Sequence, residues 1–246
     1  LGRREAVGAQ DLSGAIALGA RTQLLSELAE LDAQRAKLIA HRGRAILDDA
    51  KALVEKAGVT GVTTRLRHGD LVEAVAELEA EARVILIGKR GEAADFAKGH
   101  LGSNLERIVR ASHRPVFVAS RAFKPIEKVL LAYDGGTSAM KAVDHIARSP
   151  LFPGLKVHVV TVGPDTKEAQ KGLADAQALL KAAQIEATVA VVPGTPDKAL
   201  AELIESEGHD MLVMGAYGHS RIRSLIIGST TTEMVRSCKV PVVLMR

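Results

Sequence analysis

The chain has 246 residues, of which 47% are hydrophobic, 25% charged and 2% aromatic; this is typical of a folded globular protein and excludes disordered and collagen-like chains. No apolar run reaches the roughly 18 residues of a membrane helix, and a single cysteine, Cys238, excludes a disulfide framework or a cysteine-based zinc site within one chain. We expect a cytoplasmic protein with no membrane partner. Its net charge of +4 permits anionic ligands such as nucleotides, whereas the lack of Trp disfavours a base-stacking nucleic-acid surface.

The first half of the chain begins with a long helical pattern. Apolar residues recur with helical spacing from about residue 22 to residue 56. The following segments predict, in chain order, a strand at 59–67, a helix at 69–82, a strand at 84–87, a glycine loop, a helix at 103–112 and a strand at 116–119.

The second half alternates regularly between apolar runs and helical patterns. It predicts strands at 128–134, 157–162, 186–192, 210–215 and 240–245, separated by helices at 137–148, 166–183, 197–207 and 228–238. Continuously apolar strands that alternate with helices indicate a parallel α/β sheet covered on both faces. Ligands of such sheets bind outside the carboxyl ends of the strands.

The two halves also repeat each other. Four blocks recur in the same order: 68–78 with 193–203, 85–91 with 212–218, 102–110 with 228–236, and 115–118 with 241–244. We interpret the chain as two tandem copies of one domain, at 1–123 and 124–246, joined near 120–127.

The first copy departs from this pattern at its beginning. Its first strand should fall near residues 2–8, which read Gly-Arg-Arg-Glu-Ala-Val-Gly and do not form a buried strand pattern. We therefore expect this copy to lack the opening strand–helix–strand, and favour a missing N-terminal segment over loss of these elements.

The strongest chemical signal is a glycine motif after the fourth strand of the second copy. Gly215-Ala-Tyr-Gly218 is followed by Gly228 and Ser229 at the start of a helix. Glycines let backbone N–H groups approach an anion, and a helix N-terminus attracts phosphate. The alternative is that the glycines only form turns and that Ser229 only caps the helix.

These features resemble the universal stress protein family. The resemblance rests on Gly-x2-Gly-x9-Gly-Ser after the fourth strand, Pro-Val-Val-Leu in the last strand and Asp134 at the end of the first. It covers nearly all of the second copy and the first from about residue 40, and two copies resemble the tandem type of the family. It implies an adenine-nucleotide α-hydrolase-like (Rossmann-like) domain of five parallel strands, and ATP binding in members that keep the glycine motif.

Residue by residue, the resemblance implies a nucleotide site in the second copy. Asp134 would meet the nucleotide, Ala132 and Tyr133 would line the base pocket, and Val162 would contact adenine through its backbone. The phosphates and ribose would lie against the glycine motif, with these residues: Gly215, Gly218, Gly228, Ser229 and Thr230. Asp134 is otherwise a turn residue or a helix cap, and Val162 a buried strand residue.

The first copy has a weaker form of the motif. Ten residues, instead of nine, separate Gly88-Lys89-Arg90-Gly91 from Gly102, and counterparts of Asp134 and Val162 are not visible. Lys89 and Arg90 could attract an anion, but we do not expect this copy to build an adenine pocket. The resemblance also implies that the two copies pair through their last strands, 116–119 and 240–245.

Catalytic and metal chemistry have little support in the sequence. There is no Walker-type Gly-Lys-Ser/Thr, and no acidic pair for Mg²⁺ stands beside the glycine motif. His219 is a weak candidate for a ligand contact, Cys238 fits a buried thiol, and His100 and His113 lack metal-ligand spacing.

We therefore expect an ATP-binding stress-response or signalling module, with Mg²⁺ as an optional companion of the nucleotide, no catalytic residues and no metal site. The alternatives are a slow ATPase or adenine-compound hydrolase, and a non-binding dimerisation protein. A homodimer of the tandem chain is compatible with the sequence.

Overall fold

The computed structural model describes residues 13–89, 103–216 and 229–246, and residues 1–12, 90–102 and 217–228 lie outside the described residues. The chain divides into two compact units, Leu1–His68 and Gly69–Arg246. Each unit is considered by itself.

The first unit contains one long helix. Helix α1 spans Ser13–Lys56, so the predicted helix is confirmed and begins earlier than the sequence suggests. The strand expected at 59–67 is wrong, because these residues adopt no regular structure. Among the described residues of the second copy, the equivalent strand, Ala187–Val192, pairs only with the strand Lys156–Val162. The described part of the first copy contains no such neighbour, and an extended segment without a partner forms no ladder.

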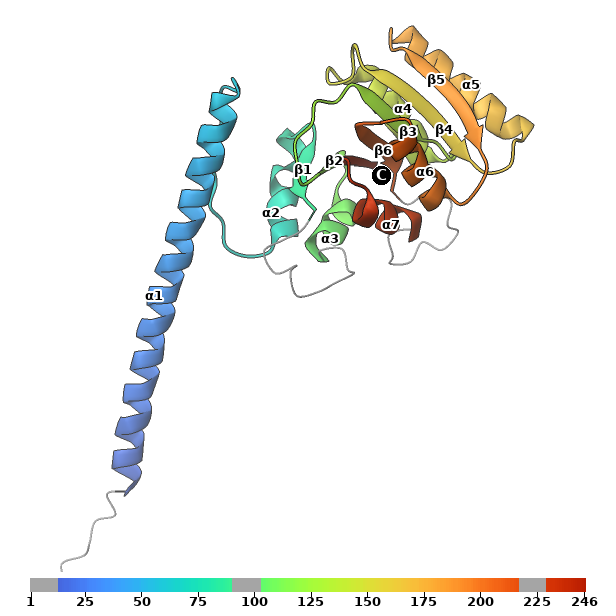
Figure 1. Ribbon diagram of the computed structural model, residues 1–246. Helices are drawn as coiled ribbons and strands as arrows, with labels where there is room; N and C mark the ends of the chain where they lie inside the picture. Colours follow the sequence, from blue (N-terminus) through green and yellow to red (C-terminus); the bar gives the residue numbers. More distant parts are fainter. Residues whose placement is uncertain (1–12, 90–102, 217–228) are drawn as a thin grey trace, which may run out of the picture. The chain divides into compact units, whose positions relative to one another are not determined.

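The second unit holds the remaining described elements, which follow the predicted order (Figure 1). Those of the first copy are α2 (Leu71–Leu78), the short helix η1 (Glu79–Glu81), β1 (Ile85–Gly88), α3 (Ser103–Ala111) and β2 (Val116–Ala119). Those of the second copy are β3 (Lys128–Ala132), α4 (Thr137–Arg148), β4 (Lys156–Val162), α5 (Lys167–Ala182), β5 (Ala187–Val192), α6 (Pro196–Ser206), β6 (Met211–Gly215), α7 (Ser229–Ser237) and β7 (Val242–Met245).

One seven-stranded sheet runs through both copies, in the order β1-β2-β7-β6-β3-β4-β5. Every neighbouring pair is parallel except β2 and β7, which are antiparallel. Phe117 lies opposite Val243 in this pair, and Val118 lies opposite Val242. The expected pairing of the two last strands is therefore confirmed, and it joins the copies into one sheet.

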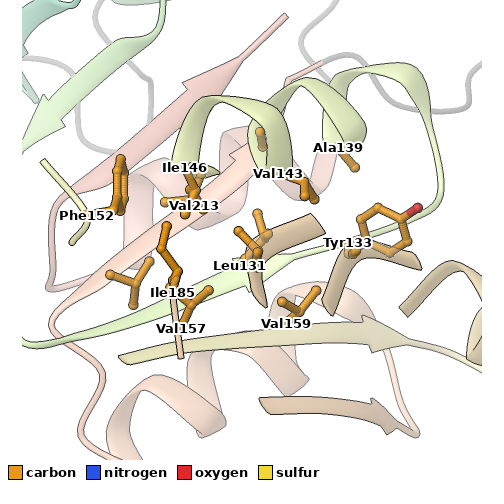
Figure 2. Packing of buried hydrophobic residues seen from close by; sticks show 14 of the residues in the cluster. Leu131, Tyr133, Ala139, Val143, Ile146, Phe152, Val157, Val159, Ile185 and Val213 are labelled. Atoms are coloured by element: carbon orange, nitrogen blue, oxygen red, sulfur yellow. The ribbon is translucent and has the colours of Figure 1, made fainter. Parts of the chain in front are cut away.

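Apolar side chains alternate between the two faces of the sheet and build a core on each. In β3, Val129 and Leu131 belong to one cluster and Leu130 to the other. Helices α4 and α5 cover the first face, which Figure 2 shows with Leu131 and Val213 below Ile146. Helices α3, α6 and α7 contribute to the second cluster. Both faces are covered, as the continuously apolar strands predict.

A buried carboxylate fastens the segment between the two copies to the sheet. Asp210, 7% exposed, precedes β6 and forms an ion pair with Lys124 at 2.6 Å. Its Oδ2 atom accepts hydrogen bonds from the backbone N–H groups of Glu127 and Lys128 at 3.1 and 3.0 Å. Burial by itself would raise the pKa of Asp210, but the salt bridge and the two N–H donors outweigh it and hold the pKa below its usual value.

The strand pairing can be tested by cross-linking. In a background without Cys238, the pair Phe117→Cys and Val243→Cys should form a disulfide within one chain, because directly opposed strand residues have Cα and Cβ atoms at bridging distance and on the same face. The measurement is the mass and mobility of the oxidised protein. The control pair Phe117→Cys and Leu244→Cys places the thiols on opposite faces and should remain reduced; cross-linking only between chains would contradict the intramolecular pairing.

The junction carboxylate makes stability depend on pH. Because the pKa of Asp210 is lower in the folded than in the unfolded chain, its contribution is present at neutral pH and is lost as the pH falls below about 4. Asp210→Asn should lower the free energy of unfolding at pH 7 by about 1–3 kcal/mol and flatten its dependence on pH in the acid range. Urea unfolding from pH 3 to pH 7 measures this, with the exposed Asp144→Asn on α4 as the control that should change little.

Candidate functional site

Three neighbouring strands bring predicted site residues to one edge of the sheet. Strand β3 lies between β6 and β4 and is parallel to both. Ala132 lies opposite Met214 of β6 and Val160 of β4, so the carboxyl ends of the three strands meet at this edge. The group comprises Ala132, Tyr133, Asp134, Val162 and Gly215.

The edge is also the point at which the chain reverses its winding. Helix α4, which follows β3, packs in the core on one face, whereas α7, which follows β6, packs in the core on the other. The helices that follow β3 and β6 therefore lie on opposite faces of the sheet, and ligands of open α/β sheets bind outside the carboxyl ends of the strands at such a point.

Asp134 lies in the turn between β3 and α4, and its side chain is exposed. Its Oδ1 atom accepts a hydrogen bond from the backbone N–H of Gly136 at 2.8 Å. Gly135 has φ +76°, a conformation that favours glycine. The hydrogen bond from Gly136 orients the exposed carboxylate of Asp134 beside the first turn of α4. Asp134 can therefore stabilise the turn and still present its carboxylate to a ligand.

The ring of Tyr133 is part of the protein core and only 6% exposed (Figure 2). Its hydroxyl donates to Sδ of Met140 at 3.1 Å, and its carbonyl accepts from the Thr161 hydroxyl at 2.8 Å. A side chain at Gly172 would lie 3.1 Å from the ring. Burial raises the pKa of the Tyr133 hydroxyl, and the carboxylates of Asp175 and Asp134 raise it further. The ring therefore anchors the end of β3 in the core.

Val162 closes β4 opposite Val192 and is half-buried against the core on the α6 and α7 face. The next residue, Gly163, has φ +147° and donates its N–H to the Val192 carbonyl at 2.9 Å. The chain thus turns directly after Val162, which places this residue at the carboxyl edge of the sheet.

Gly215 allows β6 to approach α4 closely. A Cβ atom at this position would lie 2.9 Å from Cβ of Ser138 and 3.2 Å from the backbone N of Ala139. No larger residue fits at this position without displacing the start of α4. The glycine is therefore needed for packing at this edge, in addition to any role in ligand binding.

The remaining predicted residues belong to the segment after β6. Gly218, His219 and Gly228 lie outside the described residues. Ser229 and Thr230 form the start of α7, at the predicted helix boundary, and their side chains lie outside the description.

The sequence matches the profile described as the universal stress protein family over residues 10–120 and again over 125–246. Universal stress protein Slr1230 of Synechocystis sp. is 39% identical over 245 residues, which cover 99% of this chain and 85% of that protein. The chain belongs to the universal stress protein family. The two profile matches identify it as a tandem member.

More distant relatives agree with this assignment. Universal stress protein Rv1996 of Mycobacterium tuberculosis is 24% identical in a match that covers 87% of this chain and 78% of the relative. The crystal structure of a universal stress protein from Archaeoglobus fulgidus has a TM-score of 0.67 and 26% identity, and the match covers 84% of this chain and 77% of that one. The fold of this universal stress protein is therefore shared with a solved member of the family.

The first copy of this universal stress protein ends its glycine-motif strand β1 at Gly88. The ammonium group of Lys89 donates to the backbone carbonyl of Cys238, at the end of α7, whereas Arg90 lies outside the described residues. Cys238 is 6% exposed, and burial raises the pKa of its thiol. The expectation of a buried thiol is confirmed, and a thiol in this state is a poor nucleophile.

A second group of side chains with the chemistry of metal ligands was not predicted from the sequence. His158, Glu207 and His209 converge at the opposite, amino edge of the sheet. The sequence signal for this group was Glu207-Gly208-His209 between a helix and a strand. His158 lies far from it in the sequence, and only the fold brings the three side chains together.

Within the described ranges, no helix is long and apolar enough to cross a membrane.

The close approach at Gly215 predicts a loss of stability on substitution. Gly215→Ala should lower the free energy of unfolding by about 1–3 kcal/mol, because the new methyl group overlaps α4. Urea unfolding measures the change. The double variant Gly215→Ala and Ser138→Gly removes the nearest contact and should recover part of the loss; an unchanged stability of the single variant would contradict the packing.

Proposed function

We propose that this universal stress protein binds ATP, or a closely related adenine nucleotide, at the carboxyl edge of β3, β4 and β6 and acts as a nucleotide-responsive stress or signalling module in the cytoplasm. The observation that carries the proposal is the convergence of Asp134, Val162 and Gly215 from three neighbouring strands at the point where the sheet winding reverses. The family membership and the glycine motif favour a nucleotide over other small ligands.

The described residues offer complementary chemistry to a nucleoside. The exposed carboxylate of Asp134 can accept hydrogen bonds from ribose hydroxyls, and the half-buried side chain of Val162 provides apolar surface beside a base. The first turn of α4 adds a helix N-terminus at the same edge, whose N-cap Gly136 has no side chain to block it.

The phosphates are assigned to the glycine motif in this proposal. Gly218 and Gly228 would let backbone N–H groups approach phosphate oxygens, and Ser229 and Thr230 would add hydroxyl donors at the start of α7. His219 would lie next to this group, and Mg²⁺ would accompany the nucleotide rather than occupy a protein site. We assign the function to binding and conformational signalling, with no catalytic residue.

Calorimetric titration with ATP, ADP and AMP tests the proposal. We expect about one ATP per chain, and a weakening of about 10- to 100-fold in Asp134→Asn, the loss that removal of a hydrogen bond to a charged group produces. Gly218→Val should abolish binding by filling the space that the phosphates need. Asp144→Asn, an exposed carboxylate at the other end of the same helix, is the matched control and should bind as the wild type does.

Two results would contradict the proposal. One is a folded wild-type chain that binds none of the three nucleotides. The other is binding that is unchanged in both Asp134→Asn and Gly218→Val. Measurement of phosphate release, with and without Mg²⁺, in the same samples separates binding from slow hydrolysis.

A further inference from the structure

A cluster of His158, Glu207 and His209 lies at the amino edge of the sheet, away from the proposed nucleotide site. His158 is near the start of β4, Glu207 caps the carboxyl end of α6, and His209 connects α6 to β6. The side chain of His209 is fully buried, that of His158 is 12% exposed and that of Glu207 is 38% exposed. Part of the cluster thus faces solvent and part is fixed in the core.

The three potential ligand atoms form a compact triangle. Nδ1 of His158 lies 3.3 Å from Nε2 of His209 and 3.3 Å from Oε2 of Glu207, and the third side of the triangle is 3.9 Å. A tetrahedral zinc ion with bonds of about 2.0–2.1 Å holds neighbouring ligand atoms about 3.3–3.4 Å apart. Two of the three distances already match this spacing. A small movement of the exposed Glu207 side chain would shorten the third, between Oε2 of Glu207 and Nε2 of His209, to the same value.

The hydrogen bonds of His209 leave the correct ring nitrogen facing the cluster. Its Nδ1 atom lies 3.0 Å from the carbonyl oxygen of Leu203. A carbonyl only accepts, so Nδ1 carries the proton and Nε2 presents a lone pair to His158 and Glu207. Metal-binding histidines commonly donate their second N–H to a backbone carbonyl in this way.

We propose that His158, Glu207 and His209 bind a divalent transition metal ion, with zinc as the best match in ligand type and geometry. Two imidazoles and one carboxylate form the ligand set of zinc sites that keep a fourth position open. A surface pocket of about 190 Å³ is lined by His158 and Glu207 together with Lys128 and Thr188, and it gives water or an exchangeable ligand access to that position.

The surroundings favour the charge states in which these groups bind metal. Burial lowers the pKa of both histidines, which favours the neutral imidazole that binds metal. A hydrogen bond from Lys128 lowers the pKa of Glu207 and keeps it a carboxylate. The ammonium group of Lys128 donates to Oε2 of Glu207 at 3.1 Å, so it competes with a metal ion for this oxygen. The same ammonium group donates to the backbone carbonyl of Glu207 at 3.2 Å and can keep that hydrogen bond when the ion binds.

The site adjoins the segment that joins the two copies. His209 is next to Asp210, which fastens residues 124–128 to the sheet. A bound ion would link the end of α6 and the start of β6 to β4, and so brace the amino edge beside this junction.

Titration of the untagged, chelator-stripped protein with Co²⁺ and Zn²⁺, without nucleotide, tests this inference. We expect one Co²⁺ per chain with the intense visible absorption of a low-coordinate site, and displacement of Co²⁺ by Zn²⁺. His158→Gln and Glu207→Gln should each weaken Zn²⁺ binding at least about tenfold, measured by competition with a chromophoric chelator. The side chains of His158 and Glu207 are both partly exposed, so we expect the two variants to fold as the wild type does. Circular dichroism can verify this.

Matched control variants distinguish Zn²⁺ binding by the cluster from Zn²⁺ binding by other side chains. His145→Gln on α4 and Glu202→Gln on α6 lie outside the cluster and should leave Zn²⁺ binding unchanged. Asp134→Asn should also retain it, which distinguishes this site from the proposed nucleotide site. Two results would overturn the inference: a folded wild-type chain that binds neither ion, or affinity that is unchanged in both His158→Gln and Glu207→Gln.

Discussion

The antiparallel pairing of β2 with β7 is the interaction on which the architecture depends. The described part of the first copy contributes only two strands to the sheet, and a two-stranded ribbon is at best marginally stable in water. Pairing with β7 makes these strands part of a seven-stranded sheet. It also covers an edge of each copy that would otherwise expose unpaired backbone groups. The pairing therefore stabilises the two described strands of the first copy.

Because β3, β4 and β6 are parallel neighbours, the second copy has two chemically distinct edges. At the carboxyl edge, an exposed carboxylate, a strand-ending valine and a closely packed glycine surround the point where the winding reverses. At the amino edge, two imidazoles and a carboxylate meet next to the junction of the copies. In the two proposals, the nucleotide and the metal ion therefore occupy opposite edges of the same sheet and share no ligands.

The sequence predicted the second copy well because each of its elements has a local signal. Continuous apolar runs specify β3 and β6, and helical spacing specifies α4. The segment 59–67 looked like a strand but forms none, because strand formation needs a partner as well as a suitable composition. Tyr133 was assigned to a base pocket by resemblance, whereas the alternation of strand faces places its ring in the core. The cluster of His158 with Glu207 and His209 is a product of tertiary structure alone and has no local pattern.

The most direct test of this account is the mapping of backbone amide shifts by nuclear magnetic resonance during titration with ATP. The account predicts that ATP changes the shifts of residues 134–137, Gly163 and residues 215–216, and leaves His158 and His209 at the other edge unchanged. Saturation with ATP that shifted the amino edge instead, or that left the ends of β3, β4 and β6 unaffected, would contradict it.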